Sequence, residues 1–199
     1  AILFLREKGS WMSKRRVVIT GMGAVTPLGC SVEEYWGNLV ACKSGITPLT
    51  MFDPTLFDTK FAGQCLNFDP TKWIDQKALK RFDRFAQFAL ATAIQAATDA
   101  GLDFSKLDPF RVGAIVGSGI GGIGELQAQT YRLKDKGPSK VSAFTIPKLM
   151  LNAASGNITI HFGVHGPSTG VATACASANN AMNDALRTIR RGEADVIFS

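Results

Sequence analysis

The fold of this chain is decided by the stretch Val171-Ala172-Thr173-Ala174-Cys175-Ala176-Ser177-Ala178-Asn179, in which a β-rich run stops at the cysteine and a helical pattern begins. We expect a strand over residues 170–174 and a helix over residues 175–191 that Gly192 ends. This junction points the thiol at the positive end of a helix, where unpaired N–H groups and the macrodipole favour the thiolate. The residues alone leave two interpretations open, a nucleophile among small side chains or a buried core cysteine.

Strand-like and helical runs alternate along the rest of the chain, which has 46% hydrophobic and 19% charged residues and is therefore globular. This alternation predicts an α/β fold, a mostly parallel sheet with helices on both faces. Ser31 is expected as an N-cap, and Gly101 as a left-handed residue after a helix. The expected strands are residues 17–20, 112–116 and 194–198, and the expected helices are residues 32–42, 75–100 and 147–160.

Four motifs occur in order along the chain. The first is RVVITGMG at residues 16–23, which continues into TPLG, and the second is GAIVGSGIGG at residues 113–122. The third is VSAFTIP at residues 141–147, and the fourth is the cysteine stretch, with GPS before it and GEADV after it. Together they resemble the β-ketoacyl-acyl-carrier-protein synthases of the elongating, ketoacyl synthase II-like type. The resemblance extends from about residue 13 to residue 199 and implies the N-terminal half of a thiolase-like layered fold.

The resemblance implies an acyltransferase that joins an acyl chain, held on Cys175, to malonyl-acyl carrier protein by decarboxylative Claisen condensation in fatty acid elongation. It implies an acyl pocket bordered by Ile120, Phe144, Thr145 and Ile146, and a homodimer whose neighbouring subunit can contribute this loop. It implies no metal and no organic cofactor, because the pantetheine arm of the carrier protein brings the substrates. A polyketide-type ketosynthase and a coenzyme A-dependent thiolase-fold enzyme are the alternatives within this fold.

The resemblance also divides the chain near Met12. Met12-Ser13-Lys14-Arg15-Arg16 is typical of a protein start, so residues 1–12 are expected to be a non-native or read-through extension. Residues 13–199 are expected to form the N-terminal half of a ketoacyl synthase domain. The resemblance places two catalytic histidines and a lysine in the second half, so we expect the 199 residues alone to be inactive.

Basic residues outnumber acidic ones by 22 to 16, which gives a net charge of +6. The sequence lacks the interleaved basic and aromatic residues that bind nucleic acid strands, so nucleic acid is not an expected partner. We expect one basic cluster to dock an acidic acyl carrier protein, with a solvated helix face as the simpler alternative. That cluster is Lys77, Lys80, Arg81 and Arg84, and a second group is Arg132, Lys134 and Lys136.

The cysteines show no C-x-x-C spacing, so neither a zinc site nor a disulfide framework is indicated for Cys30, Cys42, Cys65 and Cys175. The apolar run Ile2-Leu3-Phe4-Leu5 is too short for a signal-peptide core. No stretch approaches the roughly 18 apolar residues of a membrane span. We therefore expect a cytoplasmic protein with reduced thiols and no membrane partner.

Two rival functions have weaker support. Residues 117–122 satisfy the pattern G-x-G-x-x-G of a dinucleotide site, which also needs a helix at the third glycine and an acidic residue ending a strand. The sequence around Asp135 indicates a polar loop instead. A papain-like hydrolase needs a histidine partner for its cysteine. Only His161 and His165 are present, and we expect both to be structural or solvent-facing.

Overall fold

The computed structural model describes residues 2–6 and 15–199, and of residues 2–6 it describes the backbone. The strands are β1 (Ile2–Arg6), β2 (Val17–Met22), β3 (Ile46–Pro48), β4 (Phe61–Gly63), β5 (Val112–Gly117), β6 (Ser168–Val171) and β7 (Val196–Phe198). The α-helices are α1 (Val32–Val40), α2 (Gln76–Leu79), α3 (Arg84–Asp99), α4 (Ile123–Lys136), α5 (Thr145–Leu149), α6 (Ala153–Phe162) and α7 (Ser177–Arg191). Short 3₁₀ turns lie at Pro70–Lys72, Phe104–Lys106, Pro109–Arg111, Pro138–Lys140 and Ala174–Ala176.

The larger sheet has the strand order β2-β1-β7-β5-β6. Strand β5 pairs in parallel with both β6 and β7, whereas β1 is antiparallel to both of its neighbours, β2 and β7. Strands β2, β7, β5 and β6 therefore run in one direction. This confirms the expected α/β class with a mostly parallel sheet. Strands β3 and β4 form a separate antiparallel pair.

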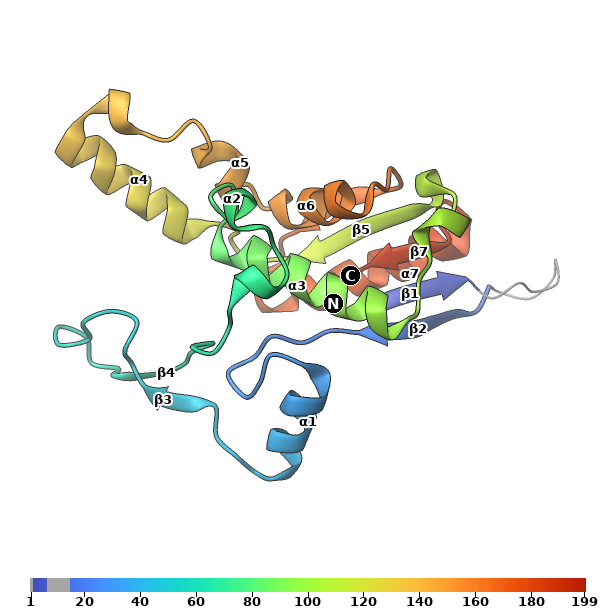
Figure 1. The fold of residues 1–199 in the computed structure, drawn as a ribbon, viewed down its shortest axis with the longest axis horizontal. Coiled ribbons are helices and arrows are strands. Elements are labelled where there is room, and N and C mark those ends of the chain that lie inside the picture. The colour runs from blue at the N-terminus through green and yellow to red at the C-terminus, as the bar shows by residue number, and fades with distance from the viewer. Residues whose placement is uncertain (1, 7–14) are drawn as a thin grey trace.

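Helices cover both faces of the larger sheet (Figure 1). On one face, Ala114 and Phe198 pack with side chains of α3 and α6 in one buried cluster. On the other face, Ile115 and Ile197 pack with side chains of α7 in a second cluster. Successive residues of a strand point to opposite faces, so β5 and β7 supply both clusters. Helix α4 extends away from this layered body (Figure 1).

The described part of the expected extension lies inside the sheet. The backbone of Ile2–Arg6 pairs with β2 on one side and with β7 on the other, with Leu3 opposite Phe198. The sequence did not predict this strand, because four apolar residues next to charged ones carry no clear strand period. The origin of residues 1–12 stays a prediction, and residues 1 and 7–12 lie outside the described residues.

The prediction of a single helix over residues 75–100 is wrong, because this segment forms the two helices α2 and α3. Asp75 caps α2 by accepting hydrogen bonds from the backbone N–H groups of Lys77 and Ala78. Asp83 caps α3 by accepting from the N–H of Phe85. An aspartate at an N-cap satisfies amide groups that have no partner within the helix, so each aspartate starts a new helix.

Two further boundaries differ from the sequence prediction. The helix expected over residues 147–160 is divided into α5 and α6 by an interruption from Met150 to Asn152. The polar loop expected around Asp135 is instead the last turn of α4, in which Lys134 and Lys136 complement the negative end of the helix dipole. Ser31, Gly101 and Gly192 have the predicted capping or left-handed conformations.

Candidate active site

The cysteine lies where the backbone passes from β6 to α7. Strand β6 ends at Val171, three residues earlier than expected, and the turn Ala174–Ala176 is a 3₁₀ helix. The α-helix itself begins at Ser177, two residues later than the expected start at residue 175. Residue 175 belongs to the short 3₁₀ turn instead. Cys175 therefore stands one turn before the regular helix, and its side chain is exposed. The exposure of Cys175 in this chain argues against the interpretation as a buried core cysteine.

The turn that carries the cysteine is held in an uncommon conformation. Ala174 has a φ of 50°, in the left-handed region that residues other than glycine seldom adopt. The buried hydroxyl of Ser177 accepts a hydrogen bond from the Thr173 N–H at 2.9 Å and donates one to the Ala174 carbonyl at 2.7 Å. The Asn180 amide donates to the Thr173 hydroxyl at 2.7 Å. Three side-chain hydrogen bonds thus fix the backbone on both sides of Ala174, immediately before the thiol.

The cysteine turn lies at the carboxyl edge of the parallel strands. Strands β5 and β6 run in parallel, and the Ser118 N–H donates to the Val171 carbonyl at 3.0 Å just beyond their ends. In open α/β sheets this edge is where ligands bind. The glycine loop of residues 117–122 and the cysteine turn therefore share one end of the molecule.

An apolar cavity of about 380 Å³ opens at the same edge between α3, α6 and α7. The cavity includes neither Cys175 nor the expected pocket residues. Sequence reasoning missed it because its lining comes from five separate elements. Its lining includes Phe85, Phe88, Ser118, Ile158, Ala178 and Met182.

The expected acyl-pocket residues lie on two adjoining segments. Ile120 is 66% exposed in the glycine loop, and Phe144 and Ile146 are also exposed. Thr145 is partly buried, and both its N–H and its hydroxyl donate to the Ser142 carbonyl. The segments meet where the Gly122 N–H donates to the Leu149 carbonyl at 3.0 Å. The two segments are therefore neighbours in the structure, while their role as walls of an acyl pocket stays a prediction.

The expected basic cluster divides into an exposed part and a packed part. Lys77, Lys80 and Arg81 are exposed on α2 and the turn after it. Arg84 is partly buried, where its guanidinium donates to the Cys65 carbonyl at 2.7 Å and lies over the Phe88 ring at 4.9 Å. Arg84 therefore supports the start of α3, and docking of a carrier protein on the four basic residues stays a prediction.

Neither histidine is on the same edge as the cysteine. His165 precedes β6, and its N–H donates to the Pro109 carbonyl just before β5, so it lies at the amino edge of the two parallel strands. His161 is in the last turn of α6, which leads back to that edge, and its ring packs edge-on against Phe162. Partial burial lowers the pKa of His161. A histidine of this chain paired with Cys175 is thus not supported.

The dinucleotide alternative fails at its acidic residue. Helix α4 does begin directly after Gly122, as the fingerprint requires. However, Asp135 lies inside α4 rather than at the end of a strand, so it cannot take the position of the ribose-binding acid. The glycines instead allow a close backbone approach, because a Cβ on Gly121 or Gly122 would come within 3 Å of the backbone at Leu149.

Among residues 15–199 no three histidine, cysteine, aspartate or glutamate side chains are arranged to hold a metal ion. None of the helices in the described part of the chain combines the length and the apolar character that crossing a bilayer requires.

A mostly parallel α/β sheet that delivers an exposed cysteine to the start of a helix is the arrangement that the resemblance to ketosynthase-type, thiolase-like proteins implies. Residues 14–199 match the family described as "Beta-ketoacyl synthase, N-terminal domain". The chain belongs to this family, which confirms the resemblance inferred from the four motifs.

Curated relatives agree with this assignment. The chain is 42% identical over 187 residues to "3-oxoacyl-[acyl-carrier-protein] synthase 2" of Synechocystis sp., a match that covers 94% of this chain and 45% of that protein. It is 38% identical over 185 residues to the protein of the same name from Staphylococcus aureus strain COL, with 93% and 45% covered. The chain thus spans a little under half the length of these relatives.

Solved structures show the same fold. "The ishigamide ketosynthase/chain length factor" superimposes with a TM-score of 0.85 at 31% identity, over 93% of this chain and 46% of that one. A beta-ketoacyl synthase from Burkholderia phymatum STM815 superimposes with a TM-score of 0.77 at 26% identity, over 90% and 44%. The thiolase-like layered fold of the N-terminal half is confirmed.

Proposed function

We propose that this chain supplies the acyl-carrying nucleophile of a 3-oxoacyl-acyl-carrier-protein synthase that elongates fatty acids. The observation that carries the proposal is the exposed Cys175 in a fixed turn at the N-terminus of α7. The positive end of a helix stabilises a thiolate, the form in which cysteine attacks a thioester. The names of the 42% and 38% identical relatives support the same reaction.

The first half-reaction transfers the acyl chain to the enzyme. The Cys175 sulfur attacks the carbonyl carbon of the acyl-carrier thioester, a new S–C bond forms, and the bond to the carrier sulfur breaks. The carrier leaves as a thiol after it takes up a proton. The Cys175 backbone N–H, at the helix start, is our candidate donor to the oxyanion, a role worth roughly 3 kcal/mol per donor.

The second half-reaction makes the carbon–carbon bond. Malonyl-acyl carrier protein loses carbon dioxide, and the electron pair of the broken bond becomes a carbanion. This carbanion attacks the acyl-enzyme carbonyl, and Cys175 leaves as a thiolate. The product is a 3-oxoacyl-acyl carrier protein. By resemblance the reaction needs no metal or organic cofactor, and the groups that polarise the two carbonyls belong to the second half of the synthase.

The same proposal assigns the partners. The exposed Lys77, Lys80 and Arg81 give an acidic carrier protein a basic surface, whose attraction raises the encounter rate more than the final affinity. We also propose that the full-length enzyme is a cytoplasmic homodimer, as the resemblance implies. The 199 residues alone are proposed to be inactive. A polyketide-type ketosynthase is the second candidate, favoured by the TM-score of 0.85 to a ketosynthase/chain length factor.

Acyl transfer is tested on the full-length enzyme with acyl-acyl carrier protein. Intact-protein and peptide mass spectrometry should find the acyl group on Cys175, and Cys175→Ala should abolish both the adduct and elongation. Cys175→Gln should keep malonyl decarboxylation without condensation. Elongation by the alanine variant would refute the assigned nucleophile. Repeated condensation without intervening reduction of the product would favour the polyketide candidate.

A further inference from the structure

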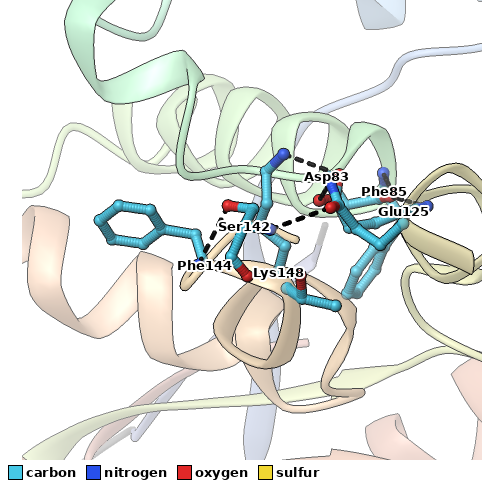
Figure 2. A network of polar contacts seen from close by, with 8 residues as sticks. Asp83, Phe85, Glu125, Ser142, Phe144 and Lys148 are labelled. Atoms are coloured by element: carbon cyan, nitrogen blue, oxygen red, sulfur yellow. Dashed lines mark hydrogen bonds and ion pairs between the residues drawn. The ribbon is translucent and has the colours of Figure 1, made fainter. Parts of the chain in front are cut away.

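A polar network ties three elements together beside the expected acyl pocket (Figure 2). Its centre is Glu125, in the first turn of α4. The Glu125 network, as we call it, joins the start of α3, the first two turns of α4 and the segment 142–148 that includes most of α5. Its side chains and backbone groups belong to Asp83, Glu125, Gln129, Ser142 and Lys148.

The Glu125 carboxylate uses its two oxygens for two different partners. Oε2 accepts from the Lys148 ammonium at 2.7 Å, and the two side chains are only 10% and 16% exposed. Oε1 accepts from the Gln129 amide at 2.9 Å, and Gln129 in turn accepts from the Ser142 N–H at 3.0 Å. Because little water reaches this ion pair, removing one partner leaves a charge that solvent cannot fully compensate.

Both arms of the network end on the same short segment. Ser142 and Lys148 stand on either side of Phe144 and Ile146, whose side chains are exposed. Ser142 also fixes the backbone of the next residues. Its hydroxyl accepts a hydrogen bond from the Phe144 N–H at 3.1 Å, and its carbonyl accepts one from the Thr145 N–H at 3.1 Å. Exposed side chains are not held by burial in the core, so polar contacts at the two ends hold this segment in place.

The network is anchored to the layered body through Asp83. One oxygen of Asp83 caps α3 through the Phe85 N–H at 3.2 Å, and the other accepts from the Glu125 N–H at 3.2 Å. The Arg81 guanidinium also lies over the Phe144 ring at 5.4 Å. These contacts therefore hold Phe144 in a fixed position relative to the start of α3. Helix α3 also lines the apolar cavity.

We propose that Glu125 is a positioning residue for acyl-chain selectivity. Its carboxylate fixes both ends of the segment 142–148, and so fixes where Phe144 and Ile146 stand against the acyl chain. This inference rests on the proposed function, because the acyl pocket is part of that function. A long acyl chain contacts more of this wall than a short one, so a loosened wall penalises long primers selectively.

The first experiment measures the segment without reference to catalysis. In the full-length enzyme, Glu125→Gln and Lys148→Met should exchange backbone hydrogens in peptides spanning residues 141–149 about tenfold faster than wild type. Peptides from α7 should be unchanged. Lys148→Arg keeps the charge and should exchange like wild type. The matched control is Lys106→Met, which removes the ion pair of Lys106, 80% exposed, with Asp103.

The second experiment measures selectivity on the same variants. For long acyl primers we expect Glu125→Gln and Lys148→Met to lower kcat/KM about tenfold, mainly through a raised KM, while short primers are unaffected. Hydrogen exchange at the wild-type rate in both variants would overturn the proposal. Faster exchange together with an equal loss of kcat/KM for short and long primers would also overturn it. If the wild-type enzyme condenses no primer, the proposed function fails and the selectivity with it, while the exchange rates still report whether Glu125 fixes the segment.

Discussion

Gly117, the last residue of β5, lies directly against Ser177, the first residue of α7. A Cβ added at Gly117 would come within 2.4 Å of the Ser177 carbonyl group and 2.6 Å of the next backbone nitrogen. No real Cβ contact is this short, and the atoms it meets belong to backbone that cannot rotate away. The strand end and the helix that carries the cysteine turn therefore approach each other only because residue 117 is glycine.

We expect Gly117→Ala to push α7 away from β5 and to move the cysteine turn with it. Overpacking of this kind typically costs about 1–3 kcal/mol of folding stability. The rate of Cys175 alkylation should change as well, because the sulfur is displaced. Gly119→Ala is the matched control, since a Cβ there meets no atom within 4 Å. Equal melting temperatures for both variants in the full-length enzyme would contradict this account.

Ser177→Ala should release the strained turn. The variant removes the hydrogen bond from the Thr173 N–H and the one to the Ala174 carbonyl, both of which are made by the buried Ser177 hydroxyl. An intramolecular hydrogen bond contributes about 0.5–1.5 kcal/mol, so chemical denaturation should show a loss of about 1–3 kcal/mol for the two bonds together. Acylation of Cys175 should also slow. Ser105→Ala, which removes an exposed hydroxyl bonded to Asp103, should leave both measurements unchanged. Wild-type stability for Ser177→Ala would mean that the turn needs no support from the hydroxyl.

Cys175 should be alkylated first among the four cysteines. Burial raises the pKa of Cys30 and of Cys65, so near neutral pH these thiols should react slowly. Cys42 is the informative comparison because it is exposed like Cys175 but follows the C-terminal end of α1, where the helix dipole disfavours an anion. Timed iodoacetamide labelling with peptide mapping gives the order, and earlier labelling of Cys42 would show that helix position does not control reactivity here.

Features with a local cause were predicted correctly from the sequence. Ser31 caps α1 because a serine oxygen accepts from an amide of the helix that starts beside it. Gly101 and Gly192 take positive φ angles because glycine has no Cβ to forbid them. The placement of Cys175 before a helix followed from the change of period in the residues around it. Each of these signals lies within a few residues of the feature it predicts.

Features that depend on distant partners were missed. The break before Asp83 and the helix α4 depend on one another, because Asp83 caps α3 and also accepts from the Glu125 N–H of α4. The pairing of Ile2–Arg6 depends on β2 and β7, which are separated by most of the chain. The role of Ser177 was missed for another reason. Its hydrogen bonds depend on the left-handed conformation of Ala174, and no pattern of residues predicts that conformation.

Folding stability should depend on His161 at mildly acidic pH. Partial burial lowers the pKa of His161 below its ordinary value of 6.5, so the folded protein holds the neutral form to lower pH than the unfolded chain does. The contribution of neutral His161 to the free energy of unfolding is therefore fully present above pH 6.5, and it is lost as the pH falls through the folded-state pKa. Denaturation between about pH 7.5 and 5.5 should show this decline, and His161→Gln should flatten it. His165→Gln is the control, and an unchanged slope for His161→Gln would assign the decline to other groups.

Ile120→Phe should shorten the range of acyl primers that the full-length enzyme accepts. Ile120 is 66% exposed in this chain, so a larger ring should cost little folding stability, and any effect must come from the acyl channel that we propose it borders. A bulky ring in a narrow apolar channel typically costs about 1–3 kcal/mol, a penalty that long primers meet and short ones avoid. The matched control is Ile160→Phe, on an 80% exposed isoleucine of α6 toward the opposite edge of the sheet. Steady-state kcat/KM over a series of primer lengths decides the matter: a uniform loss would indicate damaged folding, and no loss at any length would remove Ile120 from the channel wall.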